Sequence, residues 1–278
     1  MLVDFSEQGN IRSLLFKVNF SVNMMHDSVI RSVIVVKIAF FIPEWTTLVA
    51  YLDALRPAVE LGPLEHLWQL HLLQWKADDL WPNLNLTKLN DTSRFHVENI
   101  AKYYSKVSVD QTTDLEWFLH HINPNASVYW KRTFKFMIVD PETLSKWRQV
   151  RLTDIDLDTF YPDKSIIAAL SYLDHLVVLR WNLCTEAVAT AILEFAASST
   201  TLRELVIASS EDDYEYRCMM TTPMVADLVK WITSQPIRGL SLDAFTWYSL
   251  SLKRDVLTAA FECLTLDYFC LTRLISAT

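Results

Sequence analysis

One spacing of apolar residues recurs along the second half of the chain. Apolar side chains occupy the first, fourth and sixth places of residues 176–181, 202–207 and 237–242. The same spacing fits residues 147–152 and 266–271, so that successive copies begin 29, 26, 35 and 29 residues apart. Because side chains alternate between the two faces of a strand, each copy predicts a short strand that enters a core.

Helical patterns separate these predicted strands. Thr185 and Thr222 are expected to cap two helices, with Pro223 at the first helical position of the second, and a third helix is expected from about Ser251. The predicted apolar faces carry Val188, Ile192, Phe195 and Ala196; Val225, Leu228, Val229 and Ile232; and Val256, Leu257, Ala260, Phe261 and Leu264. A strand and a helix repeated in this way predict an α/β stack in which each unit buries its apolar side against its neighbours.

The repeated unit resembles the leucine-rich repeat. This resemblance implies a degenerate leucine-rich-repeat solenoid over residues 61–278, with a curved parallel sheet and helices on its outer side. Two earlier stretches, residues 67–72 and 81–86, also fit the spacing. They lie only 14 residues apart, too close for two complete units, and we favour residues 67–72 as the first strand.

The pattern is weaker between that first strand and the clear repeats. A strand is expected at residues 104–109, followed by a helix from about residue 112 to residue 122. A second strand at residues 134–138 and a short helix near residues 141–147 complete this part. Residues 209–216 form an acidic insertion, which predicts either a solvated loop or a loop that grips a basic partner.

Residues 24–60 predict a separate small helical segment, after an irregular leader at residues 1–23. Val33, Ile34, Ile38, Phe41 and Ile42 share one helical face before Pro43 stops the helix. Thr46 and Thr47 are expected to cap a second helix, which Pro57 closes. The apolar face of that second helix carries Leu48, Tyr51, Leu52 and Leu55.

Two short helices at a proline-marked turn, directly before leucine-rich repeats, resemble an F-box. Arg31 stands where that family prefers proline, and residues 54–57 replace its usual cysteine-arginine-tryptophan ending. The resemblance implies a substrate-recognition adaptor of a cullin-type ubiquitin ligase. The residues that it places against the ligase's adaptor protein are Ile34, Ile38, Phe41, Leu48 and Leu52. The alternative is a plain helical cap on the repeats.

The residues between the buried positions of each repeat strand predict a partner-binding surface on the concave face. These residues are Gln149, Arg151 and Thr153; Val178, Arg180 and Asn182; Glu204, Val206 and Ala208; and Gly239, Ser241 and Asp243. We expect Arg151 and Arg180 to be polar anchors for a partner protein. Alanine at both positions is expected to weaken binding and leave thermal stability nearly unchanged.

Composition excludes several other functions. The net charge of −8 argues against a nucleic-acid surface. The three glycines lie more than fifty residues apart, whereas phosphate-binding loops and nucleophile elbows need clustered glycines. We therefore expect no enzymatic activity and no cofactor. The remaining alternatives are a leucine-rich-repeat scaffold without a ligase connection and a hydrolase with a scattered active site.

The histidines and acidic residues show no metal-binding spacing. His120 and His121 are adjacent, His66 and His71 are five residues apart, and His96 and His175 are isolated. Residues 154–158 alternate aspartate with apolar residues but lack the glycine and glutamate of a calcium loop. We expect no catalytic residues and no metal site.

The chain shows no targeting or membrane segment. The longest apolar run, residues 33–42, is about half of the roughly 20 residues that a membrane span needs. The four cysteines include no C-x-x-C pair and are expected to be reduced. These observations predict a protein of the cytoplasm or nucleus.

Overall fold

The computed structural model contains an open parallel sheet of eight strands, and it describes residues 34–57, 61–110, 112–132, 148–158, 164–209, 218–272 and 275–276. The strands are β1 (Leu84–Asn85), β2 (Lys106–Val109), β3 (Ser127–Arg132), β4 (Leu152–Asp158), β5 (Val178–Cys184), β6 (Glu204–Ser209), β8 (Gly239–Asp243) and β10 (Tyr268–Thr272). They lie side by side in chain order, and every neighbouring pair is parallel. The expected α/β class with a parallel sheet is confirmed.

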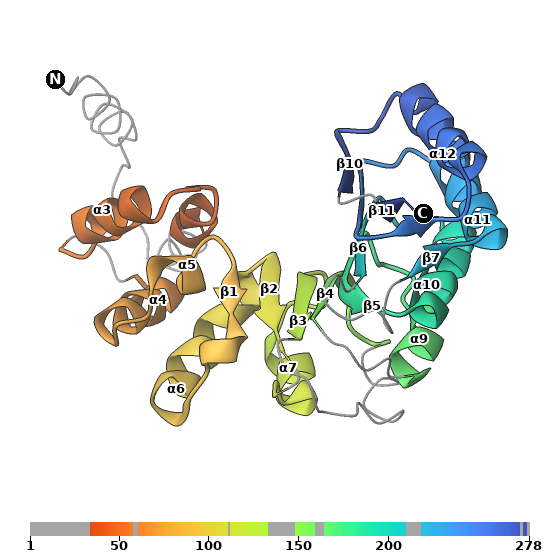
Figure 1. Cartoon of the computed structure of the whole chain (residues 1–278). Coiled ribbons are helices and arrows are strands. Elements are labelled where there is room, and N and C mark those ends of the chain that lie inside the picture. Colours follow the sequence, from red (N-terminus) through yellow and green to blue (C-terminus); the bar gives the residue numbers. More distant parts are fainter. Residues whose placement is uncertain are drawn as a thin grey trace, which may run out of the picture.

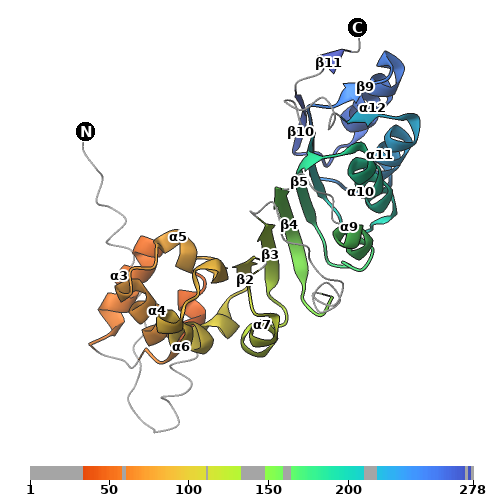
Figure 2. The ribbon, with the colours of Figure 1, turned by 60° about the horizontal axis from the view of Figure 1, so that its bottom comes forward.

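Helices lie along one side of this sheet. They are α7 (Leu115–His121), α9 (Lys164–Leu170), α10 (Glu186–Ser198), α11 (Thr222–Ser234) and α12 (Leu250–Glu262). Figures 1 and 2 both show the sheet curving with these helices on its outer side. A small second sheet beside them holds β7 (Met219–Met220), β9 (Thr246–Trp247) and β11 (Ile275–Ser276), in the order β11-β9-β7. Right-handed crossovers, the usual hand between parallel strands, account for the described helices lying on the same side.

The core between the sheet and its helices consists of in-register apolar residues. Leu179, Leu205 and Leu240 are Cα partners on β5, β6 and β8, and each is fully buried. Trp181 and Ile207 are partners one pleat further along, at 1% and 0% exposure. Burial of each such side chain contributes about 1.5–3 kcal/mol to the free energy of folding. The repeated spacing therefore stabilises every unit of the stack against its neighbours.

The strands of the clear repeats agree with the predicted positions, but the first units differ. Residues 67–72 lie within α4 (Pro63–Leu72), and the competing fit at residues 81–86 holds β1. The fit at residues 147–152 also lies five residues too early in the chain, because Leu152, and not Trp147, occupies the first place of this copy. Strand β4 begins at Leu152, and its core residues are Ile155 and Leu157.

Strand β2 lies within the predicted residues 104–109. The next strand, β3, lies at Ser127–Arg132, before the expected 134–138. The predictions for residues 134–138, 141–147 and most of the acidic insertion lie outside the described residues, as does the leader at residues 1–23.

The predicted helices of the later repeats are present, with two corrections. Thr185 caps α10 as expected, since its side chain accepts from the Val188 N–H. Thr222 is the first residue of α11 instead of its cap, which is Thr221. Phe261 and Leu264 were expected on the buried face of α12, but they are 81% and 99% exposed. Val256 and Ala260 are buried as predicted, and Ala259 is the additional buried residue of this helix.

The N-terminal part is helical and shares one core with the sheet. Residues 34–39 are helical, and α3 (Trp45–Leu55), α4, α5 (Ala77–Leu80) and α6 (Asp91–Ile100) follow. Phe40 packs between Trp81 and Tyr104, with ring centroids 4.9 and 5.1 Å away. The Trp81 indole N–H donates to the carbonyl of Ile42 at 2.7 Å. One buried cluster therefore runs from Val36 to Ala259 without a break.

Candidate functional site

The described helices leave the opposite face of the sheet uncovered, and we call it the open face. Along β5 and β6, buried residues alternate with partly exposed ones. The partly exposed positions form rows across neighbouring strands. Asp154, Val178, Glu204, Gly239 and Tyr268 share one row, and Asp156, Arg180, Val206, Ser241 and Cys270 share the next.

Five side chains on this face interact across five strands, and we call them the open-face cluster: Tyr129, Asp156, Arg180, Glu204 and Tyr268. The Tyr129 hydroxyl donates to Asp156 Oδ2 at 2.9 Å. The Arg180 guanidinium donates to the Glu204 carboxylate and forms an ion pair with it. Tyr268 also forms a hydrogen bond with Glu204.

The two tyrosines at the ends of the cluster are held in their neutral form. The pKa of Tyr129 is raised to about 12, mainly by burial and secondly by the hydrogen bond to Asp156. The pKa of Tyr268 is also raised to about 12, mainly by burial and secondly by the hydrogen bond to Glu204. Nearby Arg180 opposes both shifts. The phenols therefore act as hydrogen-bond donors to the carboxylates over the physiological pH range.

Gly239 gives the Tyr268 ring room to reach Glu204. Glycine 239 lies between these two residues in the row, as the partner of both. A Cβ atom at this position would lie 2.2 Å from Tyr268 Cε1, well inside van der Waals contact. A glycine is therefore needed at position 239 for the Tyr268 ring to pack directly against the backbone of β8.

Replacing Gly239 with alanine is expected to move Tyr268 away from Glu204 and lower its pKa from about 12 toward 10. A phenol whose folded pKa exceeds the unfolded value stabilises the fold below pH 10 and loses that contribution as pH rises toward 12. Stability between pH 10 and 12 should then fall less steeply in the variant. NMR titration of ¹³C-labelled tyrosine measures the shift, with Tyr129 as the internal control. An unchanged Tyr268 pKa in a folded G239A variant would contradict this account.

Most of the predicted partner-binding residues lie on the open face. The partly exposed ones are Val178, Arg180, Asn182, Glu204, Val206, Ala208, Ser241 and Asp243, whereas Gly239 is buried under Tyr268. From β4 to β10, the described side chains on this face include four carboxylates, Asp154, Asp156, Glu204 and Asp243, and one cation, Arg180. The β4–β10 part of this face is therefore acidic, whereas the outward positions of β2 and β3 carry the exposed cations Lys106 and Lys131.

Three predicted residues do not belong to this face. Gln149 and Arg151 precede β4, and the Arg151 guanidinium donates to the carbonyl of Asn125 at 3.1 Å. Thr153 is 7% exposed, and its hydroxyl donates to Asp154 Oδ2 at 2.7 Å. The pairing of β3 with β4 shifts register next to this threonine, so the strand turns Asp154 and Asp156 outward instead.

Tyr129, Asp154, Asp156 and Tyr268 lie on the open face although the repeat spacing did not predict them there. For the two aspartates a signal existed, because Leu152, Ile155 and Leu157 also fit the first, fourth and sixth places of the repeat. For Tyr129 it was weaker, since the corresponding first place of its strand is the polar Asn125.

The predicted adaptor-binding residues divide into two groups. Ile34, Ile38 and Phe41 are 42%, 45% and 86% exposed, so they are accessible to a partner. Leu48 and Leu52 are fully buried in the core of the N-terminal helices. The prediction that these two leucines contact an adaptor was wrong, because the second helix turns its apolar face inward.

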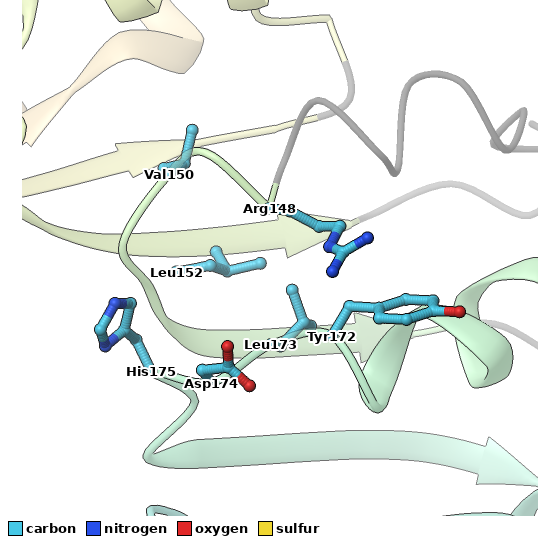
Figure 3. Close-up of a pocket in the computed structure, with 7 residues that line it drawn as sticks. All are labelled: Arg148, Val150, Leu152, Tyr172, Leu173, Asp174 and His175. Atoms are coloured by element: carbon cyan, nitrogen blue, oxygen red, sulfur yellow. The ribbon is translucent and has the colours of Figure 1, made fainter.

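A small pocket lies between the turns that precede β4 and β5, and Figure 3 shows its lining residues. The Arg148 guanidinium lies over the Tyr172 ring, 4.2 Å from its centroid. The cavity volume of about 50 Å³ holds one or two water molecules. Ligand pockets are typically at least about 300 Å³, so this pocket is too small for a cofactor or an organic substrate.

Within the described ranges, no group of three or more histidine, cysteine, aspartate or glutamate residues could hold a metal ion. In the same part of the chain, no helix has the length and apolarity to cross a membrane. No protein-family model matches the sequence, and no curated protein matches it either.

Proposed function

We propose that the chain is a leucine-rich-repeat-type protein-binding module whose open face binds a basic segment of a partner protein. The repeat interpretation is supported by strands in chain order and by the described helices that follow them on one side of the sheet. A doubly wound sheet would instead reverse its strand order and carry helices on both faces. Stacked repeats commonly present such an extended concave surface to partners.

The open-face cluster carries the proposal. Its charged and phenolic groups come from five strands, yet they converge on one surface that the described helices leave uncovered. Eight strands about 4.8 Å apart give a face roughly 35 Å long, the span of an extended peptide of about ten residues. The excess of carboxylates on β4 to β10 favours lysine and arginine side chains of a partner and would speed their association with this part of the face.

The test compares a lysine- and arginine-rich peptide of ten residues with a glutamate-rich peptide of equal length, by fluorescence anisotropy. We expect binding of the basic peptide alone, weakening as salt increases. The double variant Asp156→Asn, Glu204→Gln should weaken binding about tenfold, through loss of two charges at the contact surface.

The matched control is Glu186→Gln, Glu194→Gln, which removes two exposed charges from helix α10 on the other side of the sheet. This control changes net charge equally, so it should leave affinity within about twofold of the unmodified chain. Equal loss in both double variants would show that only net charge matters and would refute an open-face site.

We also propose the finer assignment to a ubiquitin-ligase adaptor, on the strength of one observation. Ile34 and Ile38 are exposed one turn apart on the helix of residues 34–39, and Phe41 is exposed in the turn that follows, next to the packed N-terminal helices. Exposed apolar side chains gathered on one surface mark a protein-interaction site. Docking this surface on the adaptor protein of a cullin-type ligase would make the open face a substrate-recognition surface.

A pull-down of the full chain with that adaptor protein tests this assignment. Binding should be lost in Ile38→Asp, whose side chain is 45% exposed and outside the core. Absence of binding to the unmodified chain would leave the alternative of a scaffold without a ligase connection. Assays with generic esters and phosphoesters are expected to show no turnover, and turnover would instead favour the hydrolase alternative.

A further inference from the structure

His66 and His96 meet between two packed helices, although they are 30 residues apart in the sequence. His66 lies on α4 and His96 on α6, and their Nδ1 atoms are 3.1 Å apart. His96 is isolated in the sequence, since no other histidine lies close to it along the chain. The fold brings two imidazole nitrogens to one place.

The scaffold that holds this pair is rigid. Leu64, Leu67 and Leu70 of α4 and Val97 and Ile100 of α6 are fully buried. The N-terminus of α6 is fixed by a reciprocal capping box between Asn90 and Ser93. Both histidines are partly exposed, so that solvent and small ions can reach them.

We propose that His66 and His96 form a two-histidine site for a divalent transition-metal ion of the zinc, nickel or copper class. Two nitrogen ligands of one ion, at bonds of about 2.0–2.1 Å and angles of about 90–110°, lie roughly 2.9–3.4 Å apart. The observed separation of 3.1 Å falls in that range. Imidazole is a preferred ligand for this class of ions, and water would fill the remaining positions.

The groups around the pair suit a cation. Glu65 lies beside His66, and its carboxylate already accepts a hydrogen bond from Gln69 at 2.8 Å and pairs with Arg56 at 3.6 Å. The ring of Phe95 contacts both imidazoles, with centroids 5.4 Å from each. The ion would therefore link α4 to α6 through nitrogen ligands, with an aromatic ring on one side.

The experiment titrates the full chain with Ni²⁺ or Zn²⁺ chloride, by calorimetry and by thermal unfolding. We expect one ion per chain and a rise in Tm of about 3 °C at saturating metal, since binding only the folded state stabilises it. The effect should disappear at pH 5, because protons compete with the metal for the imidazole nitrogens. In Cu²⁺-loaded protein, electron paramagnetic resonance should show two coordinated nitrogens.

His66→Ala and His96→Ala should each abolish the site, and His71→Ala should retain it. With chelator present, the Tm of each variant shows whether it is folded. A second pair, His66→Gln and His96→Gln, keeps side-chain volume in case alanine unfolds the helices. If metal has no effect on the unmodified chain, or if binding survives in the variants and depends on His120 and His121, the pair is only a hydrogen bond and the proposal is wrong.

Discussion

Replacing Trp181 with alanine is expected to lower the free energy of unfolding by about 3–5 kcal/mol. Trp181 is 1% exposed, and its Cα partners in the sheet are Leu157 and Ile207. The substitution removes a large buried apolar surface and leaves a cavity in the middle of the stack. Residues of both neighbouring units would line this cavity. Urea denaturation followed by circular dichroism measures the change.

Tyr248→Ala is the control for this experiment, because Tyr248 is another large aromatic residue but is 75% exposed. Its replacement should change stability by no more than about 0.5 kcal/mol. A loss below about 1 kcal/mol in Trp181→Ala would mean that the residue does not lie in the core, and the register of β5 would be incorrect.

The second large effect is expected from Leu52→Asp, which should unfold the N-terminal helices. Leu52 is fully buried on α3. An aspartate there must lose its hydration without a partner or bind a proton, and burial of an unpaired polar group costs several kcal/mol. Because the N-terminal helices share a core with the sheet, we expect loss of the whole cooperative transition.

Ile38→Asp is the informative comparison for Leu52→Asp. The same change at a side chain that is 45% exposed should alter stability by about 0.5 kcal/mol or less. The two variants thus separate loss of the fold from loss of a binding surface. If Ile38→Asp unfolds the chain as well, residue 38 is a core residue and cannot report on adaptor binding.

The sequence predicted strands best where every defining position is apolar. Strands β5, β6 and β8 fall where their spacing predicts them, because burial of three residues per copy determines the register, and β10 does so with three partly buried residues. The spacing alone could not separate β1 from α4, since Leu67 and Leu70 are also neighbours on a helical face. Only the number of residues between each fit and the next predicted strand distinguishes a strand at residues 67–72 from one at residues 81–86.

The candidate site was less predictable than the sheet. Alternation along a strand placed Arg180 and Glu204 on the same face, but the register shift beside Thr153 reversed the outward residues of β4. Residues 147–152 and 152–157 both fit the apolar spacing, and the pairing with the neighbouring strand, which the spacing does not describe, selects the second fit. The His66–His96 contact depends on how two helices pack, which periodicity within either helix does not determine.

The chain-order arrangement of the strands also has a consequence for folding. Each strand contacts mainly the units immediately before and after it in the sequence, so loop-closure costs are small and folding can begin in any stable unit and spread outward. Local opening should then form a gradient along the stack. Backbone amides of β5 and β6 should exchange with deuterium most slowly, and those of β1 and β10, at the two edges of the described sheet, most rapidly.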